Sequence, residues 1–143
     1  MTLTKSTLHD IPGGESLVEW FGRVPRFHDA ELLEITFSSK GGGLLRMLAW
    51  NVTDEVDAKG YFILNKHATV TFELEGVSAI NCVDFDMAPG IILDLEIAII
   101  GENFRVEWSS SYGVAGFIVA RQMRISLAPG KPDEEREKLP MQT

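Results

Sequence analysis

A chain of 143 residues has the usual length of one domain, and its composition, 45% hydrophobic and 24% charged residues, argues against a wholly disordered protein. The formal net charge of −8 disfavours binding to nucleic acid or to anionic membranes, because phosphate groups repel an acidic surface. The one cysteine, Cys82, cannot form an internal disulfide. No apolar run has the length of a signal peptide or a membrane span, so we expect a cytoplasmic protein.

The N-terminal part predicts one short helix after an irregular lead-in. Residues 1–14 combine Thr and Ser with a Pro-Gly-Gly turn and show no periodic apolar pattern. In residues 15–22, Leu17, Trp20 and Phe21 follow at spacings of three and four, which places them on one face of a helix. A helix this short needs support, so we expect Trp20 and Phe21 to pack onto a sheet.

From residue 31 onward the apolar pattern changes to a period of two, which is typical of half-buried strands. The expected strands are 31–39, 44–50, 61–64, 67–75, 80–85, 91–100, 104–108 and 116–127, with a long polar connection over 51–66 and a loop over 109–113. Short strands with turns marked by Gly or Pro predict a mostly β domain over 15–130, an antiparallel β-sandwich or a partly open barrel. Residues 131–143 form a charged C-terminal tail.

Alternation also predicts which side chains share a face. In 67–75 the inward residues are Val70, Phe72 and Leu74. Leu33, Ile35 and Phe37 share one face of the first strand, and Leu93, Leu95, Ile97 and Ile99 share one face of the strand over 91–100.

The last strand contains a conflict, because Arg121 shares its parity with Phe117, Val119, Met123 and Ile125. Either a bulge shifts the register there, or Arg121 is buried and paired. We favour the bulge, because an unpaired buried charge is costly.

The residues that usually carry catalysis do not form a recognisable pattern. His9, His28 and His67 are far apart in the sequence and lack metal-ligand spacing, so we expect no metal and no cofactor. Cys82 lies in an apolar, strand-like segment, where a small buried residue is the usual interpretation. We therefore expect a protein that is not an enzyme.

The charge distribution is more informative. Between Ala68 and Phe104 there is no lysine or arginine, while seven of the acidic residues lie there. Those proposed to contact a partner are Glu73, Glu75, Asp84, Asp86, Asp94 and Glu96. If their strands share a sheet, one face becomes a field of carboxylates, which is either a docking surface for a basic partner or an ordinary solvated face.

Two segments resemble a known family. Arg26-Phe27-His28-Asp29-Ala30-Glu31-Leu32 leads into the first strand, and the last strand runs from Gly116-Phe117-Ile118-Val119-Ala120 through Arg124-Ile125-Ser126-Leu127-Ala128-Pro129-Gly130. With Phe72-Glu73-Leu74-Glu75-Gly76-Val77 and Val106-Glu107-Trp108 between them, their order and spacing resemble the immunity protein 50 family of bacterial polymorphic-toxin systems. The resemblance covers about residues 17–130.

The resemblance implies a cytoplasmic, non-enzymatic protein that binds and neutralises a cognate toxin. Phe27, His28, Asp29 and Glu31 match the family motif without an assigned role, and we expect His28 and Asp29 to bond backbone at the strand entry.

Three function classes follow. The first is an immunity protein whose acidic face meets a basic toxin. The second is a small-molecule or lipid-binding domain with Trp50, Trp108 and Phe104 around a cavity. The third is a hydrolase-type enzyme that uses His28 with Asp29 or Glu31. An exposed sheet edge could in addition pair two copies of the chain as a homodimer.

Overall fold

The computed structural model describes residues 5–84, 86 and 90–130, which form two helices and six strands. These elements are α1 (Lys5–His9), α2 (Gly14–Phe21), β1 (Glu31–Phe37), β2 (Gly43–Val56), β3 (Phe62–Val83), β4 (Gly90–Ile100), β5 (Asn103–Tyr112) and β6 (Ala115–Pro129). The predicted C-terminal tail over 131–143 lies outside the described residues.

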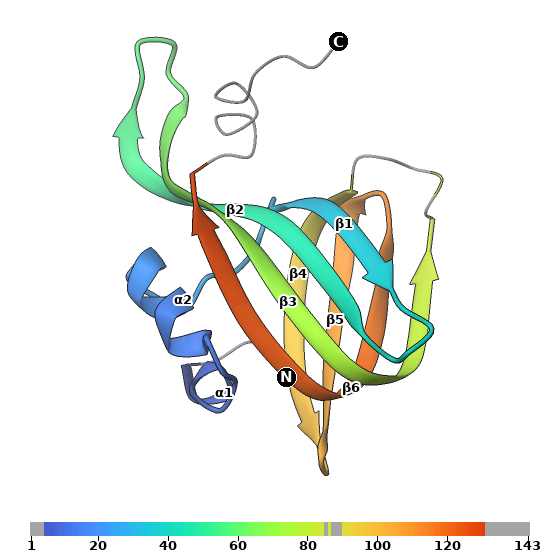
Figure 1. Ribbon diagram of the computed structural model, residues 1–143. Helices are drawn as coiled ribbons and strands as arrows, with labels where there is room; N and C mark the ends of the chain where they lie inside the picture. Colours follow the sequence, from blue (N-terminus) through green and yellow to red (C-terminus); the bar gives the residue numbers. More distant parts are fainter. Residues whose placement is uncertain (1–4, 85, 87–89, 131–143) are drawn as a thin grey trace, which may run out of the picture.

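The strands form one antiparallel ring in the order β1-β2-β3-β6-β5-β4 (Figure 1). The ring closes where β1 meets β4, through only two residue pairs, Glu31 with Ile91 and Leu32 with Gly90. This confirms the predicted mostly β fold in its form as a partly open barrel, and the described strands form no second sheet.

The expected loop over 109–113 and much of the expected connection over 51–66 are strands instead, and the short strand expected at 61–64 is the beginning of β3. β2 continues to Val56 and β3 begins at Phe62, so most of 51–66 forms a two-stranded ribbon that extends beyond the barrel (Figure 1). The region 109–113 belongs mainly to β5, because Ser109 and Ser110 pair with β4. Polar residues can form these strands because both faces of the ribbon, and one face of β5, are open to water.

The barrel interior contains one apolar core. The three residues predicted to point inward from β3, Val70, Phe72 and Leu74, are at most 1% exposed, which confirms that prediction. Leu45 and Met47 from β2, Leu95 and Ile97 from β4, and Val106 and Trp108 from β5 are equally enclosed.

The predicted alternation is wrong in β1 and at both ends of β4. A register shift between Leu32 and Glu34 places Leu32 inside and leaves Leu33 exposed. Shifts around Ile92 likewise bury that residue and leave Leu93 exposed, and Ile99 is exposed near the end of the β4–β5 hairpin. A single bulge reverses the faces of every following residue, and the amino-acid pattern does not mark where it occurs.

Arg121 is exposed, so the alternative of a buried, paired arginine does not occur. Ile118 and Ala120 face the core before it and Met123 and Ile125 after it, while both Arg121 and Gln122 face outward. The register irregularity lies on the facing strand β3, between Val77 and Ala79.

The lead-in over 1–14 is not irregular, because α1 lies within it, and the fold therefore has two short helices rather than one. The helices cover the place where β5 no longer pairs with β6, beyond Ala120. There the backbone N–H of Ile125 donates to the carbonyl of Pro12 at 2.8 Å. Leu8 and Ile11, together with Leu17 and Phe21 of α2, are buried in the core.

Two glycines test this docking. Gly13 and Gly22 both have positive φ, 87° and 75°, but a Cβ on Gly13 would overlap the carbonyl oxygen of Ile125, whereas Gly22 has open space. We expect Gly22→Ala to cost about 1 kcal/mol from the left-handed conformation alone. We expect Gly13→Ala to cost about 3 kcal/mol, because overpacking adds to the same strain. Urea unfolding measures both, and equal costs would contradict the tight contact between the helices and β6.

Candidate functional site

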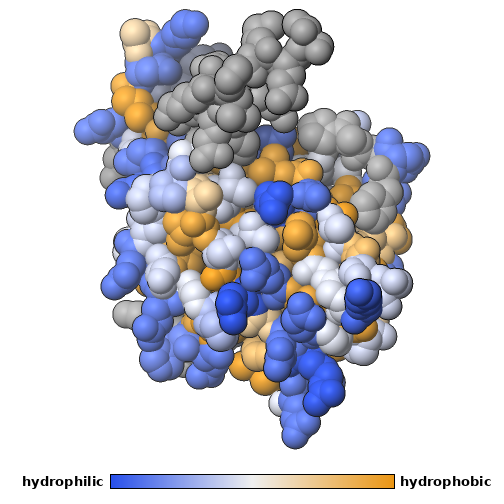
Figure 2. Space-filling model, in the orientation of Figure 1, coloured by the Kyte–Doolittle hydropathy of each residue, from blue (hydrophilic) through white to orange (hydrophobic). Residues whose placement is uncertain are grey.

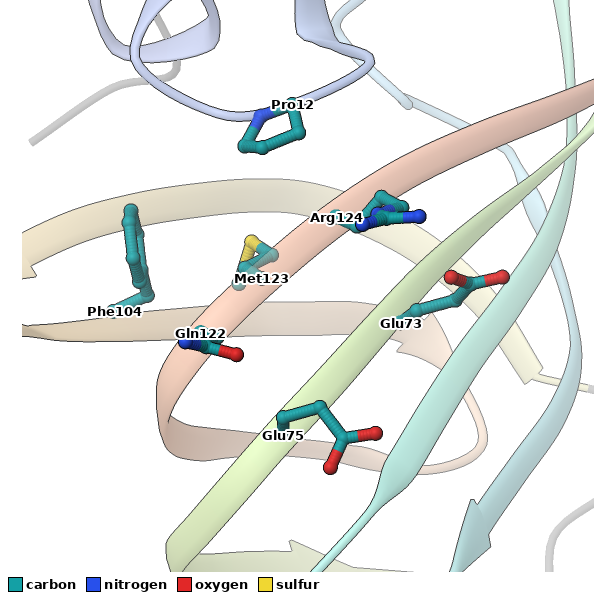
Figure 3. A pocket seen from close by; sticks show the side chains of 7 residues that line it. All are labelled: Pro12, Glu73, Glu75, Phe104, Gln122, Met123 and Arg124. Atoms are coloured by element: carbon teal, nitrogen blue, oxygen red, sulfur yellow. The ribbon is translucent and has the colours of Figure 1, made fainter.

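An open hollow of about 530 Å³ crosses the outer side of β6 (Figure 3). Its lining comes from the α1–α2 link, β3, β5 and β6, and consists of Pro12, Glu73, Glu75, Phe104, Gln122, Met123 and Arg124. We call this hollow the β6 groove. Phe104 and Pro12 lie on one side of β6 and the two glutamates on the other (Figure 3).

The β6 groove owes its polar side to strand register. Glu73 and Glu75 are two residues apart on β3, so both point outward. They lie opposite Arg124 and Gln122 of β6, respectively. Within the part of the chain that the structure describes, neither glutamate forms an ion pair or a side-chain hydrogen bond.

This arrangement can bind cationic groups. Two unpaired carboxylates can accept hydrogen bonds from an ammonium or guanidinium group, and such charge-assisted bonds are stronger than neutral ones. Phe104 adds an aromatic ring on the other side of the groove, against which a guanidinium can stack. Arg124 lowers the net negative charge of the groove. The groove therefore suits a protein surface that carries basic, polar and apolar groups better than it suits a free cation.

The predicted single face of carboxylates does not form. In the ring, β3 and β4 are separated by two strands in either direction, so Glu73 and Glu75 lie on the side of the barrel opposite to Asp94 and Glu96. Asp84 and Asp86 lie in the β3–β4 connection and not on the face of a strand. The prediction assumed a flat sheet, and closure into a barrel separates its outer face into different sides.

The other residues of the β6 groove were not found from the sequence. Gln122 and Arg124 could be recognised only once β3 and β6 were known to be neighbours, since they lie about fifty residues from the glutamates that they face. Phe104 was considered only as a lining residue of an interior cavity.

The family motif lies at the seam between β1 and β4. Phe27 is 4% exposed despite a φ of 58°, and its ring meets Phe72 edge to face, with 5.9 Å between centroids. The backbone N–H of Asp29 donates to the carbonyl of Ile92 at 2.8 Å, and the N–H of Ile92 donates to the carbonyl of Ala30 at 2.9 Å. These bonds extend the short β1–β4 pairing.

The side chain of His28 and the backbone of Asp29 also form hydrogen bonds at this seam. His28 Nδ1 donates to the carbonyl of Leu93 at 2.9 Å, as the acceptor requires, so the expected bond to backbone is formed by His28. Asp29 contributes its backbone N–H and a φ of 66°, a conformation that Asp tolerates better than most residues. The Asp29 carboxylate lies 3.7 Å from His28 Nε2 on the exposed surface. Glu31 pairs with Ile91 of β4 in the strand ladder.

The alternative sites proposed from the sequence come together only in part, because His28 Nε2 lies 3.7 Å from the Asp29 carboxylate while the three histidines lie in different places. His9 contacts Glu15 near the helices, His28 lies at the seam, and the ring of His67 lies 5.7 Å from that of Trp50 at the base of the ribbon. The three aromatic residues proposed to line one cavity are also apart, since Trp108 is in the core, Trp50 is beside His67 and Phe104 lines the β6 groove. Among the described residues, no three His, Cys, Asp or Glu side chains form a group that could hold a metal.

No protein-family model, curated protein or solved structure matches this chain. Within the described ranges, neither helix approaches the length and apolar character that crossing a bilayer requires.

The seam gives a stability prediction. We expect Phe27→Ala to lower the free energy of unfolding by about 3–5 kcal/mol, because it removes a buried ring and its partner contact with Phe72. Phe37→Ala is the matched control, since Phe37 ends the strand β1 that follows Phe27 but is 37% exposed, and it should cost about 1 kcal/mol. Denaturant unfolding distinguishes them, and similar losses would argue against a tightly packed seam.

Cys82 gives a reactivity prediction. Partial burial raises the pKa of its thiol above the ordinary 9.0, because the charged thiolate would lose hydration there. The folded state therefore holds the proton more tightly, and this contribution to stability is lost as pH rises above about 9. We expect iodoacetamide to alkylate the native thiol more slowly at pH 8 than the unfolded one, and faster native alkylation would indicate an activated cysteine.

Proposed function

We propose that this protein is a non-enzymatic binding protein that docks a basic protein on the β6 groove, and that it acts in the cytoplasm as an immunity protein against a cognate toxin. The observation that carries the proposal is the pair Glu73 and Glu75, which face outward without an ion pair among the described residues. A basic residue of a partner would supply the missing counter-charges.

The position of the groove supports this function. Glu73 pairs with both β2 and β6, and Glu75 pairs with β6, so the backbone of both residues is fixed before binding. A rigid, prearranged surface loses little conformational entropy when a partner docks. Phe104 and Pro12 add apolar contact beside the charges, which resembles the mixed composition of protein interfaces.

The total charge and the family resemblance support the same partner class. A net charge of −8 attracts a basic protein over a distance and speeds its association. The resemblance to toxin-neutralising proteins suggests that the partner is a toxin, and toxins that cleave nucleic acid present basic surfaces to their own substrate. An acidic inhibitor that occupied such a surface would block access to that substrate.

The test compares two double charge reversals with equal net charge. Glu73→Lys/Glu75→Lys alters the β6 groove, while Asp86→Lys/Asp94→Lys alters exposed acidic residues elsewhere. Tagged full-length proteins are used to capture partners from the source cells at low and moderate salt, and the affinity of any captured protein is then measured. We expect one basic protein whose binding falls at least tenfold, about 1.4 kcal/mol, with the groove variant and little with the control.

Toxicity is tested separately. The captured protein, expressed alone, should arrest growth, and co-expression of the wild-type chain should restore it while the groove variant should not. Equal binding by both double variants would reject the groove as the docking site. If the captured protein binds but does not arrest growth, the proposed binding function stands and the proposed immunity function is rejected.

A further inference from the structure

The ribbon formed by residues 51–66 projects from the barrel as a separate feature, which we call the arm (Figure 1). β2 pairs with β1 only as far as Leu48, and β3 pairs with β6 only from Ala68 onward. Beyond these points the arm strands pair only with each other within the described residues. Both of its outer edges therefore present backbone groups that another strand can bind.

The arm exposes large apolar side chains, some of which are visible as apolar surface among hydrophilic residues at the upper left of Figure 2. The exposed fractions are 56% for Val56, 70% for Tyr61, 61% for Phe62, 38% for Ile63 and 41% for Leu64. Val56 pairs with Phe62, and side chains alternate along a strand, so these two residues and Leu64 lie on one face of the arm. Tyr61 and Ile63 lie on the other face, so both faces of the arm expose large apolar side chains, which are typical of interaction surfaces. The run from Tyr61 to Leu64 also lacks the charges and prolines that normally protect an exposed edge.

Contacts from α2 hold the base of the arm. Trp20 Nε1 donates to the carbonyl of Lys66 at 3.1 Å, and Lys66 Nζ lies 4.6 Å from the centre of the Trp20 ring. On the other strand, Asn51 Nδ2 donates to the carbonyl of Phe21 at 2.8 Å. Lys66 has a φ of 57°, an unfavourable conformation for lysine that marks where the ribbon leaves the barrel. The arm is thus held away from the core, with its apolar residues presented outward.

Charge decides which partner fits the arm. Residues 51–66 contain three acidic residues and two lysines, so the arm carries −1 and the rest of the chain −7. A basic partner would be attracted to the rest of the molecule, whereas the arm is the region where two copies of this acidic chain repel each other least. An uncharged apolar edge is also complementary to an identical edge.

We propose that the arm binds the arm of a second copy of this chain, with the β3 edges of the two arms paired antiparallel about a two-fold axis. Such pairing would place Leu64 opposite its own copy and Ile63 opposite Asn65 of the other chain, with no like charges facing each other. Apolar side chains on both faces of the paired arms and the backbone groups of the joined edges would form the interface, for which roughly 800 Å² per partner is the standard size. The proposed dimer leaves the β6 groove unaltered.

The test is sedimentation of the full chain from about 1 μM to about 1 mM, which covers weak and moderate dimers. We expect the mass to rise from one chain to two. Phe62→Lys/Leu64→Lys should weaken dimerisation at least tenfold, because the strand edge then carries the charges that natural edges use against pairing. Ile99→Lys/Ile100→Lys is the matched control, since these β4 residues near the β4–β5 turn are 41% and 53% exposed and should not affect the dimer. Circular dichroism verifies that both variants fold.

A second measurement tests the register. In a Cys82→Ser background, Leu64→Cys should form a disulfide-linked dimer on mild oxidation, because opposed residues of antiparallel strands lie within disulfide reach. A chain that stays monomeric throughout overturns the proposal, and hydrogen exchange then identifies the reason. Protected arm amides in the monomer would mean that another part of the same chain covers the arm, and unprotected ones would mean that nothing does. A dimer insensitive to Phe62→Lys/Leu64→Lys would also overturn it.

Discussion

The barrel depends on the seam between β1 and β4. Only two residue pairs join these strands, and three further bonds from the preceding turn, two backbone bonds around Ile92 and one from the His28 ring, extend the connection. Phe27 fixes this turn from inside by packing on Phe72 of β3, across the core. The seam explains why two left-handed residues, Phe27 and Asp29, occur so close together: the chain must turn sharply to present Ala30 and Asp29 to Ile92. The most distinctive sequence motif is thus explained by architecture and needs no catalytic role.

Closure also determines how the acidic residues can act. An open sheet would have placed Glu73, Glu75, Asp94 and Glu96 on one continuous face, but the ring turns β3 and β4 away from each other. Charges that look like one field in the sequence become a local pair beside Arg124 and a separate group on β4. The same closure leaves β6 without β5 beyond Ala120, and the helices fill this place through Pro12 and Gly13. The β6 groove lies at this junction, which brings Phe104 and Pro12 near the glutamates.

The sequence was sufficient for the fold class, for α2 and for the inward residues of β3, because these follow from uninterrupted periodicity. It failed where periodicity was broken or absent. Bulges near Leu32 and Ile92 reversed the faces of following residues, and the β2 strand of the ribbon, over 51–56, lacked an apolar period. α1 was missed because only Leu8 and Ile11 anchor it, and their partners lie far away in the sequence. Of the candidate site, Glu73 and Glu75 could be selected by charge, whereas Gln122 and Arg124 required knowledge of strand order.

The bond between Pro12 and Ile125 joins two residues that are far apart in the sequence, so the first is synthesised well before the second. β1 likewise cannot complete its pairing until β4 has been synthesised, and β3 cannot complete its pairing until β6 has been synthesised. Contacts of such large sequence separation slow folding, because the loops between them must close first. The N-terminal half therefore emerges from the ribosome with unpaired edges and an apolar face uncovered. In a cell that also makes an interacting protein, the concentration of folded chain that can bind this protein is determined by how quickly β6 is synthesised and paired.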